Sequence, residues 1–205
     1  MVTLRDDVRA ERRAAILEQA TAIVGERGYN GFGIQELAQR CGLTKAGLLH
    51  HFPSKEQLLI AVLRERDRQD EIAVAAFPGV VEPGDGGDPA ALTTIRTSLR
   101  AIVSRNATRP QFVRLYAMLR AEALHPDHPA HAWFSNREAA TLEMFTQMVA
   151  PHVDRPRSVA RQVKALMSGL ELQWLRDGQR FDLVAEWDLG IAALLPLPSA
   201  RNTQR

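Results

Sequence analysis

Between Thr44 and His51, the sequence TKAGLLHH gathers hydroxyl, ammonium and imidazole groups on one short segment. These groups can bind phosphates, and a lysine can also reach the edge of a guanine. The small residues among them would let a helix backbone approach a groove closely, and a leucine can contact the methyl group of a thymine. If this segment is the recognition helix of a DNA-binding motif, the residues predicted to contact DNA are Thr44, Lys45, Ala46, Gly47, Leu49, His50 and His51.

A second group of chemistry-bearing side chains is the run HPDHPAH at residues 125–131, which contains three histidines and one aspartate. Imidazole and carboxylate groups are ligands for zinc and similar ions. The two prolines impose an extended backbone, however, so these side chains need not converge, and Asp127 or His128 can instead cap a helix that begins at Pro129. We expect no metal site, and keep as an alternative an all-helical metal-dependent hydrolase that uses His125, Asp127, His128 and His131.

Signals for helix ends surround the predicted DNA-contacting segment. Residues 34–40 have the pattern of a short amphipathic helix, and Gly42 suits the positive φ that reverses a chain between two helices. Thr44 can cap a second short helix through its hydroxyl group. Ser54, with a glutamine three residues later, has the S-x-x-Q pattern of a capping box that begins a third helix. Two short helices joined by a glycine turn are typical of the helix-turn-helix, which places its second helix in the major groove.

The run Leu43–Glu56, LTKAGLLHHFPSKE, resembles the DNA-binding signature of TetR-family transcriptional regulators, which is roughly V-S-x-G-x-L-Y-x-H-F-x-S-K-E. The resemblance covers the chain as far as residue 65. It implies an N-terminal helix-turn-helix domain, a larger helical domain that binds an effector and dimerises, and a contact of Lys55 with the DNA backbone. Two positions depart from the pattern, since Leu49 replaces a tyrosine that contacts a phosphate and Ala46-Gly47 replaces a glycine and a small residue.

Composition limits the class of protein. The chain has 205 residues, of which 45% are apolar, so it can bury a core as one large domain or two small ones. Charged residues interrupt every apolar run, and the N-terminus lacks the apolar centre of a secretory signal. Cys41 is the only cysteine of the chain, which excludes an internal disulfide framework. We therefore expect a cytoplasmic protein without membrane contact or cofactor, while the net charge of +2 says little about a nucleic-acid partner.

Helical periodicity covers nearly all of the chain, and no segment alternates like a strand. The exception is residues 77–89, FPGVVEPGDGGDP, with three prolines and four glycines. The charged run at residues 64–71 predicts a solvated second half for the helix that begins at Ser54. We predict an all-α fold, with a helix-turn-helix DNA-binding domain at residues 1–65 and a larger effector-binding and dimerisation domain at residues 66–205. The expected helices cover residues 8–25, 34–40, 44–51, 54–75, 90–106, 110–123, 129–150, 156–177 and 183–195.

The last two expected helices have more apolar surface than one neighbour can cover. Residues 158–177 carry one face of large apolar side chains and a second face of small ones, which calls for a second partner such as a symmetry-related copy. We predict a dimer interface through Ala165, Ser168, Gly169, Leu172, Trp187 and Ile191.

Aromatic and flexible side chains are frequent in the second part of the chain. They can line a cavity or simply fill the core, and the resemblance favours a cavity for a small organic effector. The residues predicted to hold this effector are Phe112, Tyr116, Arg120, Trp133, Phe134, Glu171 and Trp174.

These features predict a sequence-specific transcriptional regulator that is not an enzyme, and in particular a homodimeric repressor released from operator DNA by its effector. Besides the hydrolase, one alternative stays open. A protein of the same shape could mediate interactions without binding DNA, since Leu49 lacks the hydroxyl group that contacts a phosphate.

Overall fold

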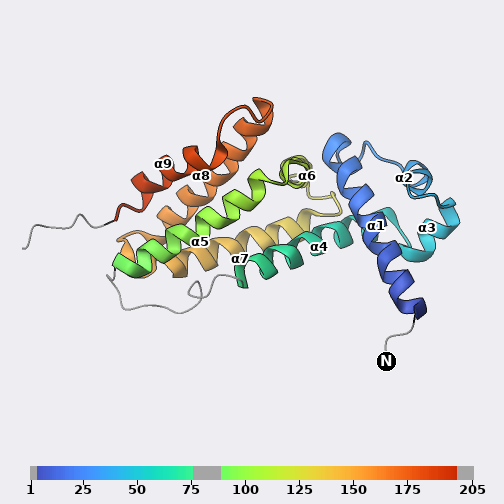
Figure 1. Cartoon of the computed structure of the whole chain (residues 1–205), viewed down its shortest axis with the longest axis horizontal. Coiled ribbons are helices and arrows are strands. Elements are labelled where there is room, and N and C mark those ends of the chain that lie inside the picture. Colours follow the sequence, from blue (N-terminus) through green and yellow to red (C-terminus); the bar gives the residue numbers. More distant parts are fainter. Residues whose placement is uncertain (1–3, 76–88, 198–205) are drawn as a thin grey trace, which may run out of the picture. The chain divides into compact units, whose positions relative to one another are not determined.

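The computed structural model describes the backbone of residues 4–75 and 89–197, and the side chains of residues 7–68 and 90–197. Every element within these ranges is a helix, which confirms the all-α class (Figure 1). The elements are α1 (Leu4–Arg27), α2 (Ile34–Arg40), α3 (Lys45–His51), α4 (Lys55–Ala75), α5 (Pro89–Ala107), α6 (Pro110–Glu122), α7 (His131–Val149), the short 3₁₀ helix η1 (Ala150–His152), α8 (Pro156–Arg176) and α9 (Leu183–Leu194). Within the described ranges, no helix is both long enough and apolar enough to span a bilayer.

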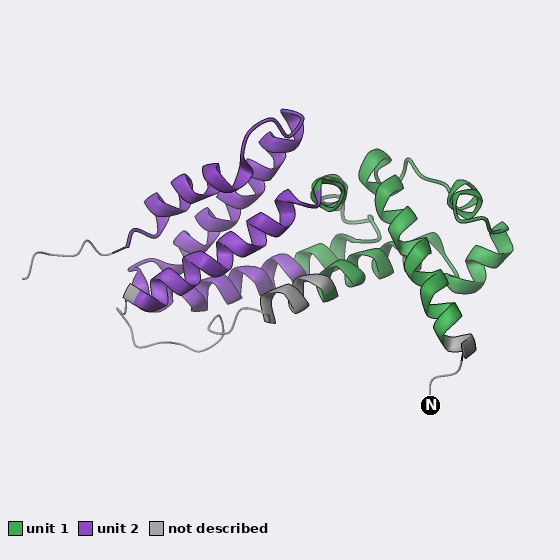
Figure 2. Ribbon diagram, in the orientation of Figure 1, with its two compact units in different colours: residues 1–69, 110–135 green, residues 70–109, 136–205 purple. Residues whose placement is uncertain are grey.

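The chain divides into two compact units, which Figure 2 shows in different colours. Unit 1 comprises residues 1–69 and 110–135, and unit 2 comprises residues 70–109 and 136–205. Residues 110–135, which contain α6, fall in the second of the two domains predicted from the sequence. The assignment of DNA binding to residues 1–65 and of effector binding and dimerisation to the remainder stays a prediction.

Unit 1 packs α1 against α6, and the helix-turn-helix elements α2 and α3 complete its core together with the start of α4. Gly25 allows the close approach of α1 to α6. A Cβ atom at Gly25 would lie 3.1 Å from the carbonyl oxygen of Gln111 and 3.3 Å from the backbone nitrogen of Leu115. The fully buried side chains of this core include Ile16, Ile23, Leu37, Leu48, Leu58, Leu115 and Leu119.

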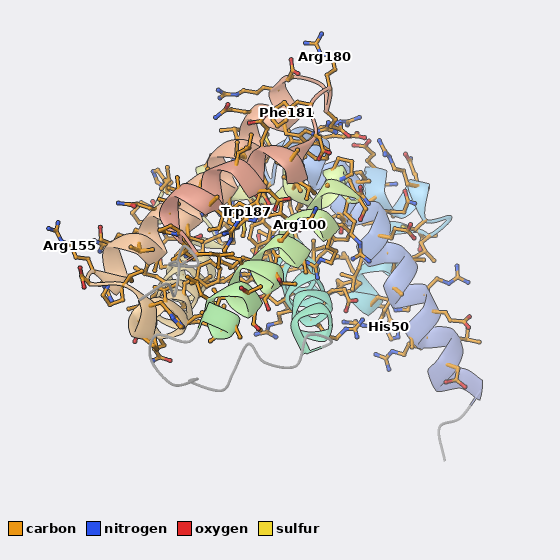
Figure 3. The ribbon with its side chains drawn as sticks, turned by 60° about the vertical axis from the view of Figure 1, so that its left-hand side comes forward. His50, Arg100, Arg155, Arg180, Phe181 and Trp187 are labelled. Atoms are coloured by element: carbon orange, nitrogen blue, oxygen red, sulfur yellow. The ribbon has the colours of Figure 1, made fainter. Side chains whose placement is uncertain are left out.

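Unit 2 packs α9 against α5 and α8, and its core is a separate apolar cluster. Gly190 brings α9 close to α8, since a Cβ atom there would lie 2.8 Å from both Cδ atoms of Leu166. On the surface, Arg100 of α5 pairs with Asp188 of α9, with Nε 2.8 Å from Oδ2. Arg100 is labelled in Figure 3, together with Trp187, the largest fully buried side chain of this unit.

The expected helices agree with the observed ones within two residues at most ends; α1 begins at Leu4 and not at residue 8, and α7 begins at His131 and not at Pro129. Residues 123–130 form turns, and α7 begins at His131. In these turns, the backbone N–H of His131 donates to the carbonyl oxygen of His128 at 2.8 Å, and the helical pattern starts when Phe134 N–H donates to Ala130. The proline- and glycine-rich run at residues 77–89 lies almost entirely outside the described residues.

The expectation of a fully solvated charged run in the second half of α4 is also wrong at Arg66. This side chain is buried, and its guanidinium carbon lies 3.5 Å from the centroid of the Tyr116 ring on α6. A planar guanidinium can stack on an aromatic face while its stem covers apolar surface, so a charged residue can belong to a core.

Substitutions at Gly42 test the left-handed backbone conformation on which the turn of the helix-turn-helix depends. Its φ is +64°, and no heavy atom lies within 4 Å of a Cβ atom built there, so a substitution meets conformational strain and no steric clash. We expect Gly42→Ala to lower the free energy of unfolding by about 1–2 kcal/mol. Gly42→Asn should lose less, because asparagine tolerates the left-handed region. Urea unfolding of both variants measures the difference, and equal losses would contradict the explanation.

Candidate nucleic-acid interface

The turn between α2 and α3 has the hydrogen bonds of a glycine-terminated helix. The backbone N–H of Leu43 donates to the carbonyl oxygen of Ala38 at 2.8 Å, and that of Gly42 donates to Gln39 at 3.1 Å. With Gly42 in the left-handed region, these bonds form a Schellman motif that satisfies the last carbonyl groups of α2. The predicted role of Gly42 in reversing the chain is confirmed.

Thr44 begins α3 as predicted from the sequence. Its Oγ1 accepts a hydrogen bond from the backbone N–H of Gly47 at 3.0 Å, which confirms the N-cap. A Cβ atom at Gly47 would lie 3.3 Å from that same oxygen, so a small residue suits this position. The first turn of α3 is therefore held by a side chain and leaves Lys45 and Ala46 exposed.

The two faces of α3 differ sharply in burial. Leu48 is 0% exposed and Phe52, which follows the helix, is 2% exposed, so both pack into the core of unit 1 as expected. Lys45 and His50 are exposed, while Leu49 is half-buried (Figure 3 labels His50). Burial of one face thus keeps an opposite face of α3, with basic and small residues, available to a partner.

Lys55 at the start of α4 has aromatic neighbours. Its Nζ lies 4.4 Å from the centroid of the Tyr29 ring and 4.5 Å from that of Phe32. Burial lowers the pKa of Lys55 below its ordinary value, while the carboxylates of Glu56 and Glu122 act in the opposite direction. The N-cap of α4 is Ser54, whose Oγ accepts from the backbone N–H of Gln57 at 3.1 Å. A contact of Lys55 with the DNA backbone stays a prediction. In the absence of DNA, the ammonium group of Lys55 packs on the rings of Tyr29 and Phe32.

Tyr29, which the sequence analysis did not select, connects the end of α1 with α4 and α6. Its hydroxyl group donates to Oε1 of Glu56, and its backbone N–H donates to Oε2 of Glu122, both at 2.8 Å. Burial and the hydrogen bond to Glu56 raise the pKa of Tyr29 above its ordinary value. Its partners are 27 and 93 residues away in the chain, so no local pattern could have revealed the role of Tyr29.

Comparison with known proteins places this arrangement in a family. The family model described as "Bacterial regulatory proteins, tetR family" matches residues 16–62, which contain α2, α3 and the start of α4. The transcriptional regulator RutR of Escherichia coli K12 is 33% identical over 107 residues, or 52% of this chain and 47% of RutR. Residues 16–62 therefore carry a DNA-binding segment of the TetR family. The chain spans about half the length of this curated relative.

Other TetR-family relatives cover more of the chain. BetI of Rhizobium meliloti is 28% identical over 167 residues, which is 79% of this chain and 77% of BetI. Among solved structures, AibR in complex with isovaleryl coenzyme A and operator DNA has a TM-score of 0.73 at 22% identity, covering 91% of this chain and 100% of AibR. FadR of Bacillus subtilis in complex with stearoyl-CoA has a TM-score of 0.71 at 15% identity, covering 89% of this chain and 97% of FadR. At these identities the structural likeness concerns the fold.

The side chains of the histidine-rich run at residues 125–131 do not gather around one point. The side chains of His125 and Asp127 are 71% and 92% exposed, whereas that of His128 is 6% exposed and its ring packs edge-on against Tyr29. His131 Nδ1 lies 2.8 Å from the carbonyl oxygen of Ala123. Among the described residues there is no group of three or more His, Cys, Asp or Glu side chains that could hold a metal ion. The geometry therefore gives the hydrolase alternative no support.

The residues predicted to hold an effector are divided between the two units. Tyr116, Trp133 and Phe134 form an edge-to-face cluster in unit 1, with ring centroids 4.8–6.0 Å apart. Phe112 packs against the same core, and Arg120 also belongs to unit 1. In unit 2, Glu171 accepts a hydrogen bond from Asn106 at 2.6 Å, and Trp174 is part of the core. Of these predicted residues, the rings of Tyr116, Trp133 and Phe134 are in direct contact with one another.

The predicted dimer residues also fall into two groups. Ala165 and Leu172 of α8 are exposed, and Ser168 and Gly169 between them are half-buried. Trp187 and Ile191 of α9 are 0% and 1% exposed and pack inside unit 2. Side chains buried within their own subunit cannot contact a partner subunit, so Trp187 and Ile191 are not included in the proposed dimer interface.

Acid should destabilise the folded chain through two histidines. Burial, first of all, lowers the pKa of His51 and of His128; neighbouring cations add to this at His51, while Glu122 opposes it at His128. The unfolded chain therefore binds more protons below roughly pH 6.5, and stability is lost as the pH falls through that region.

Urea unfolding from roughly pH 7.5 to 5.5 should show this loss, and the variant carrying His51→Gln and His128→Gln should show a flatter dependence. An identical slope in wild type and variant would assign the acid sensitivity to other groups.

Proposed function

We propose that the chain is a homodimeric, sequence-specific DNA-binding repressor that a small organic effector releases from its operator. The observation that carries the proposal is the two-sided α3: Leu48 and Phe52 hold it in the core, while Lys45, Ala46 and His50 face outward. This helix lies in the segment that the TetR-family model matches. A helix presented in this way fits the major groove, where side chains at its N-terminal end meet the base edges.

A dimer follows from the small footprint of one recognition helix. A single helix-turn-helix contacts too few base pairs to be specific among the competing sites of a genome. Two copies on half-sites about 34–36 Å apart, or one helical turn of DNA, would double the contacts. We assign the dimer contact to Ala165, Ser168, Gly169 and Leu172, which lie at positions i, i+3, i+4 and i+7 on one face of α8 and include its small residues.

Release by an effector requires that the effector bind one arrangement of the protein better than the DNA-bound one. By linkage, operator DNA then weakens effector binding by the same factor, with a coupling of about 1–3 kcal/mol in typical systems. The aromatic cluster of Tyr116, Trp133 and Phe134 supports an apolar ligand. Because AibR and FadR were crystallised with acyl-CoA thioesters, we propose these thioesters as the first ligand class to consider.

DNA binding should depend on Lys45. We expect the protein to bind one or more duplexes from the intergenic DNA beside its own gene, with an affinity that falls steeply between about 50 and 200 mM salt. Lys45→Ala should weaken operator binding about 10-fold or more, because each half-site loses a charged contact. Fluorescence anisotropy measures both effects.

The matched control for Lys45→Ala is Arg180→Ala, in the turn between α8 and α9 (Figure 3). Arg180 is 78% exposed and lies outside the segment matched by the family model, so the control should bind the operator like wild type. If no such duplex binds even at low salt, the proposal fails and the interaction protein without DNA binding replaces it.

A substitution at Leu172 tests the dimer proposal, because Leu172 is an exposed leucine at the C-terminal end of the four residues assigned to the dimer contact. In a two-fold interface, Leu172→Glu brings two carboxylates together, which costs several kcal/mol, so dimerisation should weaken about 100-fold or more. Leu124→Glu is the control, because Leu124 is 80% exposed and lies after α6 in unit 1. Sedimentation velocity reports the association state, and an unchanged dimer for Leu172→Glu would remove α8 from the interface.

A further inference from the structure

From Asp7 to Arg13, α1 separates its charges by face. Arg9, Arg12 and Arg13 recur at i, i+3 and i+4, which places them on one side of a helix with about 3.6 residues per turn. Asp7 and Glu11 fall on the opposite side by the same geometry. Like charges at these spacings repel one another. The arrangement therefore concentrates positive charge on one face at a cost to the isolated protein.

The guanidinium group of Arg13 makes its contacts within the protein. Its Nη1 donates a hydrogen bond to the backbone carbonyl of His51, in the last turn of α3, and its guanidinium carbon lies 4.2 Å from the centroid of the Phe52 ring. The bond satisfies a carbonyl group that has no partner within its own helix. Arg13 thus fixes the C-terminal end of α3 to α1 and brings the arginine face of α1 beside that end.

Arg9 and Arg12 remain exposed on this face, and they make no hydrogen bond or ion pair within the part of the chain that the structure describes. Both lie within about one turn of Arg13 along α1, and Arg13 contacts the end of α3, so these two arginines lie near that end. Burial lowers the pKa of His51, and the charges of Arg13, Arg9 and Arg12 add to this effect. The surface beside the C-terminal end of α3 is therefore positive and lacks a described acidic partner. An anion bound there would relieve the repulsion.

We propose that Arg9 and Arg12 of α1 bind the phosphates of the DNA strand that passes the C-terminal end of α3, and that Arg13 positions α3 without contacting DNA. This inference rests on the proposed DNA binding and adds a second element to it. Exposed guanidinium groups are suited to phosphate oxygens, which they can bind through two parallel hydrogen bonds. Such contacts hold a protein in register on a duplex and carry no direct sequence information.

The salt dependence of DNA binding separates the two roles. Each phosphate contact contributes about 0.9 to the slope of log affinity against log salt, so Arg12→Gln should reduce the slope of a symmetric dimer by about 1.8. The loss of affinity should be nearly equal for the operator and for an unrelated duplex. Arg9→Gln should behave in the same way, and neither variant should unfold at a lower temperature than wild type, because each removes a charge that its neighbours repel.

Arg13→Gln, which removes the same charge one residue further along α1, is the matched comparison. It should leave the salt slope unchanged, lower the thermal midpoint of unfolding, and weaken operator binding more than binding to an unrelated duplex, because the recognition helix loses its orientation. Thermal unfolding in the absence of DNA supplies a readout that a phosphate contact would not move.

Three outcomes are decisive. If the variant with both Arg9→Gln and Arg12→Gln keeps the wild-type slope while Lys45→Ala weakens binding, the phosphate assignment is overturned and DNA binding through α3 stands. If Arg13→Gln lowers the slope as Arg12→Gln does, Arg13 is itself a phosphate contact and its positioning role is refuted. If wild type binds no duplex at low salt, this inference falls together with the proposed function.

Discussion

The orientation of α3 depends on the burial of Leu48 and Phe52 in the core of unit 1. These two side chains are almost completely excluded from solvent, and each such burial contributes about 1.5–3 kcal/mol. Arg13 adds a hydrogen bond and a ring contact at the same end of the helix. Without this anchoring, Lys45 and His50 would have no fixed direction, and the outward face of α3 could not match a groove.

Short helices make such anchoring necessary. Both α2 and α3 have seven residues, well below the length at which an isolated helix is stable in water. Local interactions stabilise the helix ends: Gly42, in the left-handed region, ends α2, and the hydroxyl groups of Thr44 and Ser54 cap α3 and α4. Burial of apolar side chains in the core of unit 1 stabilises the central residues of α2 and α3. The outward face of α3, which is proposed to meet DNA, is therefore held in place by contacts on the buried side of the helix.

Charge distribution, and not net charge, supports the proposed binding of this chain to DNA. The formal net charge is only +2, yet α1 carries its arginines on one face and α3 adds Lys45 and His50. Some charged groups pack on aromatic rings within the protein: Lys55 lies over Tyr29 and Phe32, and Arg66 lies over Tyr116. The remaining exposed cations define where a phosphate backbone would be attracted, because an unpaired charge at the surface acts over about 8–10 Å at moderate ionic strength.

The sequence alone determined the helical class, most helix bounds, the turn at Gly42 and the caps at Thr44 and Ser54, because each depends on residues within a few positions of one another. Only the tertiary structure decided that Trp187 and Ile191 are core residues, that Arg66 stacks on a ring, and that His128 packs against Tyr29 while His125 stays in solvent. Helical periodicity predicts which face of a helix is apolar, but it does not predict which neighbouring element covers that face. The contact of Arg13 with a carbonyl group 38 residues away has the same origin, since folding brings together groups that no local pattern relates.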